Sequence, residues 1–216
     1  MKIDSKLQRD VMDELRWEPQ VDAAHIGVTA KNGVVTLTGS VPNYSQKLAA
    51  EAATRRVSGV EAIAEEIEVN FAGDPPTSDP DIAERIVNML KWDVNVPDGV
   101  KVKVEHGRVS LTGEVDWNYQ KSAAAKPAGR IAGVKCVTNL ISVKPRVSSA
   151  DVRQRIMSAF NRSSSLEANA LDIAVEGGTV KLSGTVHSWD ERRIAENAAW
   201  AAPGVTKVTD NIVLAY

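Results

Sequence analysis

The chain has few of the residues from which disulfide frameworks, metal sites and nucleophilic centres are built. Its 216 residues include one cysteine, Cys136, so an internal disulfide is excluded. None of the three histidines, His25, His106 and His187, has a second histidine or a cysteine at metal-ligand spacing. We therefore interpret the histidines as solvated loop residues. Cys136 has no matched histidine nearby and is expected to be a spectator thiol.

Strong net charge and long apolar runs are also absent. The formal net charge is −2, which gives no electrostatic case for a nucleic-acid partner. Basic minus acidic residues give 8 − 11 = −3 for residues 1–72, 11 − 9 = +2 for 73–146 and 7 − 8 = −1 for 147–216. Residues 1–10 lack the apolar stretch of a signal peptide, and no run is long enough to cross a membrane. The prediction is a cytoplasmic protein, or a periplasmic one if a leader has been removed.

One short pattern occurs three times. It reads GRVSLTGEV at Gly107–Val115, GVVTLTGSV at Gly33–Val41 and GTVKLSGTV at Gly178–Val186. Apolar and polar residues alternate, which predicts a strand with one buried and one wet face. A glycine on the apolar face predicts close approach by a helix or another backbone. These glycines are Gly39, Gly113 and Gly184.

The flanks of this pattern repeat as well. Each copy opens with a pair suited to a tight hairpin turn, namely Asn32-Gly33, His106-Gly107 and Gly177-Gly178. Each of Gly39, Gly113 and Gly184 is followed 20 residues later by another glycine. These are Gly59, Gly133 and Gly204. Internal repeats of this kind decide the architecture. We predict three domains, 1–72, 73–146 and 147–216, with a Pro-rich linker at 73–80.

The first repeat displays the expected order of elements most clearly. Helical and alternating periodicities predict helix, strand, strand, helix and strand over Asp4–Trp17, His25–Ala30, Val34–Val41, Ser45–Val57 and Ile63–Phe71. The β-α-β part is expected to be a right-handed crossover. The predicted fold class is α+β, with three tandem α-β-β-α-β domains. Each is expected to have a three-stranded mixed sheet and two helices on one face.

The later repeats carry their own local signals. Ser78 with Asp81, and Ser148 with Asp151, fit helix caps. Pro127 lies inside the second helix of the middle repeat, which predicts that this helix is shortened or bent. Asn161–Ser165, NRSSS, is predicted to be a polar loop, and the middle repeat is predicted to end with a strand through Leu140–Val143.

The aromatic residues fall at two recurring places. Trp17 and Trp92 end the first helix of repeats one and two, where repeat three has Arg162. The start of the second helix carries the other set, Tyr44, Trp117, Tyr119 and Trp189. These rings either pack at the strand–helix junction or form an aromatic rim for a partner or a membrane surface.

The outward faces of the predicted sheets are polar, as Thr36, Thr38 and Ser40 illustrate. They are either solvated, or they pack the domains together and accept a partner by strand addition. Domains of about 70 residues bury only about 60% of their unfolded surface, so we expect packing against one another or another molecule. A homo-oligomer is one such arrangement.

The glycine-centred strand, an Ala-rich helix, a Gly-Val pair and a final strand together resemble the BON domain (bacterial OsmY and nodulation). The final stretch is Val60–Val69, Val134–Val143 and Val205–Leu214. The resemblance covers nearly the whole chain and implies an α-β-β-α-β fold in which Gly39, Gly113 and Gly184 are the fold-defining glycines. It implies a non-enzymatic bacterial protein of osmotic and envelope stress, with no catalytic residues, metal or cofactor to carry over.

For BON proteins, the resemblance implies binding of phospholipid or membrane surfaces, chaperone-like binding of client proteins, or ion binding. We expect a binding protein of the first two kinds. The alternative is an ion- or ligand-sensing protein whose domains rearrange. An enzyme would need a pocket of convergent polar groups, and the sequence offers none.

Overall fold

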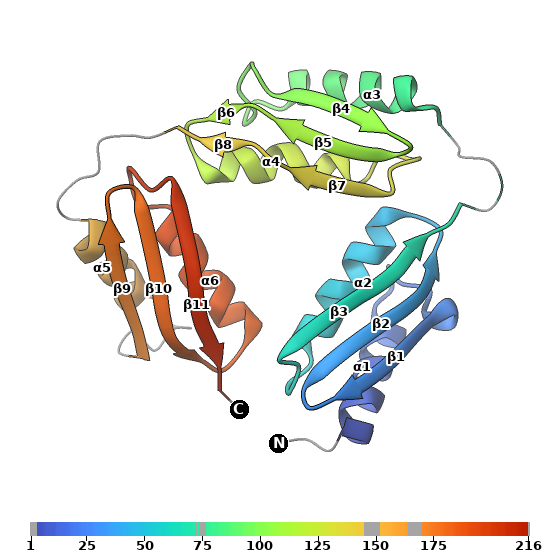
Figure 1. Cartoon of the computed structure of the whole chain (residues 1–216), viewed down its shortest axis with the longest axis horizontal. Coiled ribbons are helices and arrows are strands. Elements are labelled where there is room, and N and C mark those ends of the chain that lie inside the picture. Colours follow the sequence, from blue (N-terminus) through green and yellow to red (C-terminus); the bar gives the residue numbers. More distant parts are fainter. Residues whose placement is uncertain (1–3, 72, 74–76, 145–151, 164–169, 216) are drawn as a thin grey trace. The chain divides into compact units, whose positions relative to one another are not determined.

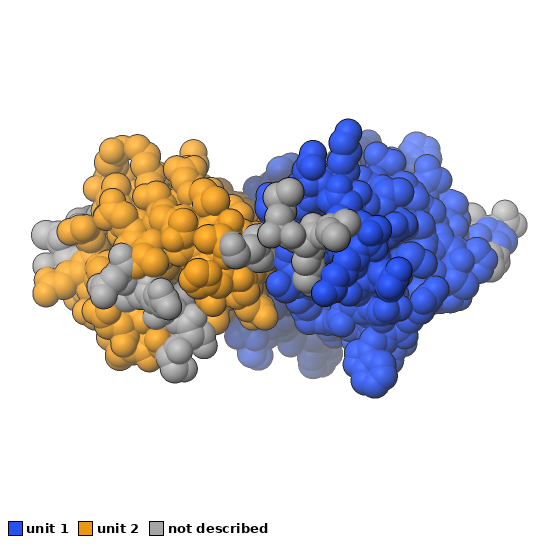
Figure 2. All heavy atoms as spheres, turned by 90° about the horizontal axis from the view of Figure 1, so that it is seen from below, with its two compact units in different colours: residues 1–113, 122–140 blue, residues 114–121, 141–216 orange. Residues whose placement is uncertain are grey.

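The computed structural model describes residues 4–71, 73, 77–144, 152–163 and 170–215 (Figure 1). Three α-β-β-α-β repeats follow one another along the chain. The chain divides into two compact units (Figure 2), Met1–Gly113 with Ser122–Leu140, and Glu114–Lys121 with Ile141–Tyr216. The second repeat contributes residues to both units.

Repeat 1 contains two helices, a short 3-10 turn and a three-stranded sheet. In chain order these are α1 Asp4–Trp17, η1 Ala23–His25, β1 Ile26–Lys31, β2 Val34–Val41, α2 Tyr44–Arg56 and β3 Ala62–Val69. The strand order is β1-β2-β3, with β1 antiparallel and β3 parallel to β2. The sheet is therefore mixed, as predicted.

The core of repeat 1 lies between its sheet and its two helices (Figure 1). The four-residue spacing of Leu7, Val11 and Leu15 places all three on the buried face of α1. From α2 the buried residues are small, Ala50 and Ala53, so this helix can lie close to the sheet. One face of the sheet is thus covered by both helices.

Repeat 3 has the same plan. Its elements are α5 Val152–Arg162, β9 Leu171–Glu176, β10 Thr179–Val186, α6 Trp189–Trp200 and β11 Lys207–Leu214. The strand order is β9-β10-β11, again antiparallel and then parallel. Val152, Ile156 and Phe160 form the buried stripe of α5, and Ala195 and Ala199 that of α6.

Repeat 2 departs from this plan because its strands are interrupted. Its elements are α3 Asp79–Trp92, β4 Lys101–Glu105, β5 Arg108–Thr112, β6 Glu114–Val115, α4 Asn118–Ala128, β7 Cys136–Asn139 and β8 Ser142–Val143. The strands pair in the order β4-β5-β7, and β6 pairs separately with β8. The buried stripe of α3 is Ile82, Ile86 and Leu90.

Two expectations for the strands of repeat 2 were wrong. The central pattern does not form one continuous strand, since Gly113 lies between β5 and β6 and belongs to neither. Positive φ alone does not cause this break, because Gly39 and Gly184 also have positive φ and lie inside the continuous strands β2 and β10. The final strand is likewise divided, with Leu140 and Ile141 between β7 and β8. The pairing offset is unchanged across the break, since Arg108 pairs with Cys136 and Glu114 with Ser142. The ladder is therefore interrupted without slipping in register.

The local helix signals had mixed outcomes. Ser78 caps α3 by accepting from the Asp81 N–H at 3.4 Å, as predicted. The helix containing Pro127 has 11 residues, against 13 in α2 and 12 in α6, as expected for a shortened helix. The polar-loop prediction for Asn161–Ser165 was wrong at its start, because Asn161 and Arg162 belong to the last turn of α5. The predicted Ser148–Asp151 cap lies outside the described residues.

Candidate functional site

The repeat glycines lie where a neighbouring backbone comes very close. A Cβ added to Gly39, at φ +111, would lie 2.0 Å from the carbonyl oxygen of His25. The corresponding distance at Gly184, with φ +118, is 2.1 Å to the Ala170 oxygen, and at Gly113 it is 2.7 Å to the Gly99 oxygen. The closest approach therefore comes from the segment entering the first strand, and not from an α-helix. The glycines that follow the second helices, Gly59, Gly133 and Gly204, also have positive φ.

Of the four aromatic residues predicted as a partner surface, one is well exposed. Tyr119 is exposed, whereas Tyr44, Trp117 and Trp189 are half-buried. Burial raises the pKa of Tyr44. The ring of Trp189 lies 5.2 Å from the guanidinium carbon of Arg192, a cation–π contact within the same helix. The role of this set as a partner surface stays a prediction.

Among the described aromatic residues, the most exposed are the tryptophans that end the first helices. Trp17 is 82% exposed and Trp92 is 87% exposed. Each lies two residues after the last buried residue of its helix, Leu15 or Leu90, so its side chain points away from the core. Packing of the hydrophobic core does not explain why side chains this large are exposed.

The end of α3 has further apolar residues beside its tryptophan. Val94, in the turn that follows α3, is 97% exposed, and Val87 in the preceding helical turn is also exposed. Lys91, in the last turn of α3, adds a positive charge to this end of the helix. We call Val87, Lys91, Trp92 and Val94 the α3 tip. The carboxylate of Asp93 accepts hydrogen bonds from the backbone and side-chain nitrogens of Asn95 at 2.9 and 3.0 Å.

The end of α1 has a different electrostatic setting. Glu14 and Glu18 flank Trp17, and both pair with Arg56 of α2, the guanidinium nitrogen lying 2.8 Å from each carboxylate. The hydrogen bond from Arg56 lowers the pKa of Glu18. Arg16, in the last turn of α1, pairs with Asp13 at 3.3 Å. Three carboxylates therefore face two guanidinium groups, which leaves this end with one excess negative charge. At the end of α3, Lys91 and the Asp93 carboxylate balance, so this end has no such excess. The two exposed tryptophans share a position but not a charge environment.

The turn between the first two strands is held by an aspartate that sequence reasoning missed. The Asp79 carboxylate accepts from the N–H groups of His106 and Gly107 at 2.6 and 2.8 Å. These bonds, the one from Gly107 above all, lower the pKa of Asp79. In repeat 1 the Asp4 carboxylate accepts from the Asn32 N–H at 2.9 Å. The shared signal is an aspartate at the first position of each helix, paired with a turn residue at positive φ.

No metal site is assembled in the described part of the chain. There, no three His, Cys, Asp or Glu side chains come together where a metal ion could bind. His25, His106 and His187 are exposed, and Cys136 is a half-buried free thiol. None of the described helices has the length and apolarity of a membrane span.

The fold and these surfaces define a class of small tandem α-β-β-α-β modules that carry exposed helix ends. The BON domain model matches residues 3–70, 78–145 and 148–216, so the chain belongs to the BON domain family. The predicted family and fold class are confirmed. The domain boundaries at 72/73 and 146/147 stay predictions.

Named relatives agree with this assignment. The chain is 29% identical over 150 residues to osmotically-inducible protein Y of Escherichia coli, covering 65% of this chain and 73% of that protein. It is 31% identical over 140 residues to the outer membrane lipoprotein DolP of Haemophilus influenzae, covering 62% and 71%. The C-terminal domain of CdsD, a structural protein of the Chlamydia trachomatis type III secretion system, aligns over 100% of both chains with 15% identity and a TM-score of 0.28. A score this low carries no argument about this chain.

Proposed function

We propose that this BON protein is a non-enzymatic, stress-related binding protein that attaches peripherally to anionic phospholipid surfaces through the α3 tip. One observation carries the proposal: Trp92 and Val94, at 87% and 97% exposure, lie beside the positive charge of Lys91. Amphipathic rings suit the boundary between lipid headgroups and acyl chains. A neighbouring lysine adds attraction to anionic headgroups.

The size of the expected effect follows from the buried apolar area. Burying a large apolar side chain contributes about 1.5–3 kcal/mol, and one cation near an anionic surface about 1 kcal/mol. Trp92 is therefore the dominant contact and Lys91 a smaller one. A tip of this size supports reversible attachment and not permanent anchoring.

The end of α1 is the natural comparison, because Trp17 is exposed to nearly the same degree. Its neighbours Glu14 and Glu18 are acidic, and residues 1–72 carry a net charge of −3 by count, against +2 for residues 73–146. An anionic surface repels such a setting. We therefore assign attachment to repeat 2.

The names of the relatives support this choice in a general way. One relative is described as osmotically inducible and the other as an outer membrane lipoprotein. Client binding stays a prediction, as does the cytoplasmic location. Ion sensing has less support, because the described residues contain no cluster of three metal-ligating side chains.

The test is flotation of the purified full chain with vesicles of neutral lipid alone, or of neutral lipid mixed with phosphatidylglycerol. We expect flotation only with the anionic mixture, weakened by salt. Trp92→Ala is expected to lower the apparent affinity about 30-fold, the equivalent of about 2 kcal/mol. The matched control is Trp17→Ala, which removes an equally exposed ring from the acidic helix end and is expected to change affinity less than about threefold.

Two results would contradict the proposal. Failure of the wild-type chain to float under any condition would remove membrane attachment altogether. Equal losses in Trp92→Ala and Trp17→Ala would show that exposed rings act without regard to charge, and would remove the α3 tip as the specific site.

A further inference from the structure

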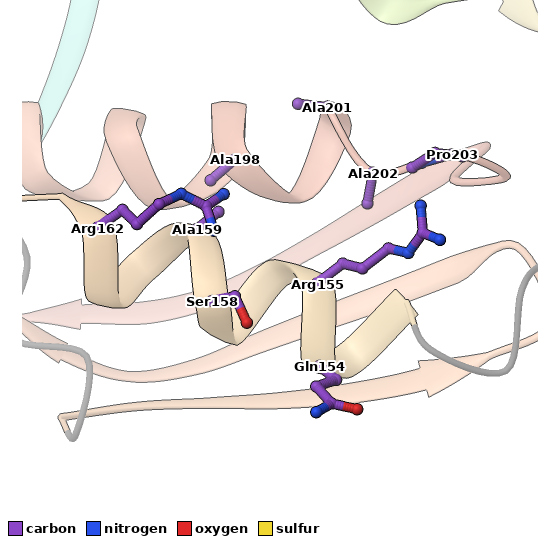
Figure 3. Close-up of a pocket in the computed structure, with 9 residues that line it drawn as sticks. All are labelled: Gln154, Arg155, Ser158, Ala159, Arg162, Ala198, Ala201, Ala202 and Pro203. Carbon is purple, nitrogen blue, oxygen red and sulfur yellow. The ribbon is translucent and has the colours of Figure 1, made fainter.

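A groove lies between α5 and the C-terminal end of α6 in repeat 3 (Figure 3). Its volume is about 490 Å³. Its wall contains small side chains, namely Ala159 from α5, Ala198 from α6 and Ala202 just after the end of α6. Arg155 and Arg162 of α5 also line the groove, together with Gln154, Ser158, Ala201 and Pro203. Both arginine side chains extend from α5 toward the α6 side (Figure 3). We call this feature the α5–α6 groove.

The positive charge of the two groove arginines is not balanced by an ion pair within the described residues. Neither Arg155 nor Arg162 forms an ion pair with any described residue, whereas Arg153 on the same helix pairs with Asp172 at 3.4 Å. The sequence of α5, VRQRIMSAFNR, contains three arginines and no acidic residue. In contrast, α3 contains Asp79, Asp81 and Glu84. Repeat 3 is thus the repeat whose first helix is uniformly basic.

The two arginines have a defined spacing. They are seven residues apart, so they lie on one face of α5 about 10 Å apart along its axis. A second α-helix lying along the groove has the same rise per residue as α5. Two carboxylates seven residues apart on that helix would therefore have the same spacing as the two arginines and face both guanidinium groups.

We propose that the α5–α6 groove receives an acidic amphipathic helix of a protein partner. Because the alanine side chains are small, the axis of that helix can lie about 8 Å from a neighbouring helix axis, which is the lower limit for packed helices. The partner presents small residues toward Ala159 and Ala198, and a carboxylate toward each of Arg155 and Arg162. Docking of this kind is a helix-in-groove interaction with charged ends. The groove is separate from the α3 tip and does not depend on membrane attachment.

The experiment uses the full chain and a fluorescein-labelled, alanine-rich peptide of about 18 residues with two glutamates seven residues apart, followed by fluorescence anisotropy at low salt. The control peptide has the same composition with the glutamates five residues apart, which places them on different faces. The variants are Arg155→Gln, Arg162→Gln and the double variant. Arg193→Gln, on the exposed side of α6 outside the groove, controls for loss of one positive charge.

We expect the seven-spaced peptide to bind about tenfold more tightly than the control peptide. Each groove variant is expected to lose about fivefold and the double variant about 25-fold, while Arg193→Gln changes affinity less than about twofold. Circular dichroism should be unchanged, because glutamine retains much of the length of the side chain and both arginines lie outside the core.

Three results would overturn the proposal. The first is no binding of the seven-spaced peptide, and the second is equal binding of both peptides. The third is a double variant that binds the peptide normally but no longer floats with phosphatidylglycerol vesicles, which would make the groove a lipid headgroup site instead.

Discussion

The last residue of the first helix differs among the repeats in a way that the core does not require. The buried stripes are equivalent: Leu7, Val11 and Leu15 in α1, Ile82, Ile86 and Leu90 in α3, and Val152, Ile156 and Phe160 in α5. Two residues after each stripe stand Trp17, Trp92 and Arg162. The fold requires the buried stripe to be apolar, whereas the residue two positions after the stripe can differ among the repeats.

Charge separates these three ends more clearly than hydrophobicity does. The end of α1 places a tryptophan beside Glu14 and Glu18, and that of α3 places one beside Lys91. The end of α5 has an arginine that lines a groove. We conclude that one fold carries an acidic end, a membrane-attaching end and a partner-binding end, the last two as proposals.

A second comparison concerns the contact between the second helix and the last strand. Lys47 of α2 pairs with Glu65 of β3 at 3.1 Å, and Arg192 of α6 pairs with Asp210 of β11 at 2.6 Å. The strand position that carries these acids is Asn139 in repeat 2, which has no charge. Repeat 2 is also the repeat with the interrupted strands. It therefore has the least regular sheet among the three.

The largest expected effect concerns the glycines in the central strands. Gly39→Ala and Gly184→Ala would place a Cβ 2.0 and 2.1 Å from a backbone oxygen, so each is expected to destabilise its repeat by about 3 kcal/mol or more. Gly113→Ala, at 2.7 Å, is expected to cost less. Hydrogen exchange measured by mass spectrometry would report each repeat separately.

A matched control separates the clash from backbone strain. Gly99 has φ +107, close to the +111 of Gly39, but nothing lies within 4 Å of an added Cβ. Gly99→Ala should therefore cost only the strain of positive φ, about 1 kcal/mol. Equal costs at Gly39 and Gly99 would show that the neighbouring carbonyl yields, and that close approach is not what selects glycine.

The next largest effect converts one helix end into another. Arg162→Trp would give α5 the exposed ring of α3, and the full chain is expected to bind phosphatidylglycerol vesicles about tenfold more tightly, the ring outweighing the lost cation. Arg162→Gln, which removes the charge without adding a ring, should bind no more tightly than wild type. Flotation measures both, and no gain from the tryptophan would mean that an exposed ring at this position is not sufficient.

A smaller effect is expected for the ion pairs that join helix to strand in repeats 1 and 3. The side chains of Arg192 and Asp210 are 25% and 18% exposed, so their pair is only partly screened by solvent. Arg192→Met is expected to cost about 1 kcal/mol in repeat 3, and Lys47→Met a similar amount in repeat 1. Urea unfolding combined with hydrogen exchange would measure both costs.

The control for these ion pairs is an exposed pair on the same helix. Arg193 and Asp190 of α6 lie 3.0 Å apart, with side chains 65% and 71% exposed. Arg193→Met should cost less than about 0.5 kcal/mol, because solvent screens such a pair. Equal costs for Arg192→Met and Arg193→Met would refute a special role for the contact between helix and strand.

The smallest effect is expected at the turn of repeat 2. Hydrogen bonds from Gly107 and His106 hold the pKa of Asp79 below its ordinary value. The stability from this carboxylate is therefore complete above the unfolded pKa of about 4 and is lost as pH falls through the lower folded value. Asp79→Asn should flatten the pH dependence of the melting temperature below about pH 4. A difference in melting temperature between wild type and Asp79→Asn that grew as the pH fell would contradict this prediction.

Sequence periodicity predicted most of the fold, because the same pattern of helices and strands occurs three times along the chain. The range predicted for the first helix, Asp4–Trp17, and that for the strand Val34–Val41 both agree with the structure. The breaks in repeat 2 could not be predicted, since GRVSLTGEV alternates as regularly as its two copies. The ends of a strand are defined by which backbone hydrogen bonds form with its neighbours, and periodicity does not report these bonds.

The candidate sites were predictable only in part. The sequence identified Trp17, Trp92 and Arg162 as helix ends, but their exposure depends on the turns that follow. The α5–α6 groove was not predicted. Arg162 was placed both at the end of the first helix and in the predicted loop Asn161–Ser165, so it was not linked to the helix face that carries Arg155. The seven-residue spacing from Arg155, visible in the sequence, would have indicated a shared face.

The most direct test of the α3 tip is fluorescence quenching by lipids that carry bromine on their acyl chains. Two versions of the chain would each retain one exposed tryptophan, Trp92 or Trp17, with the other four tryptophans replaced by phenylalanine. We expect brominated phosphatidylglycerol vesicles to quench the Trp92 protein strongly and the Trp17 protein weakly. Quenching of neither, or of Trp17 more than Trp92, would contradict attachment through the α3 tip.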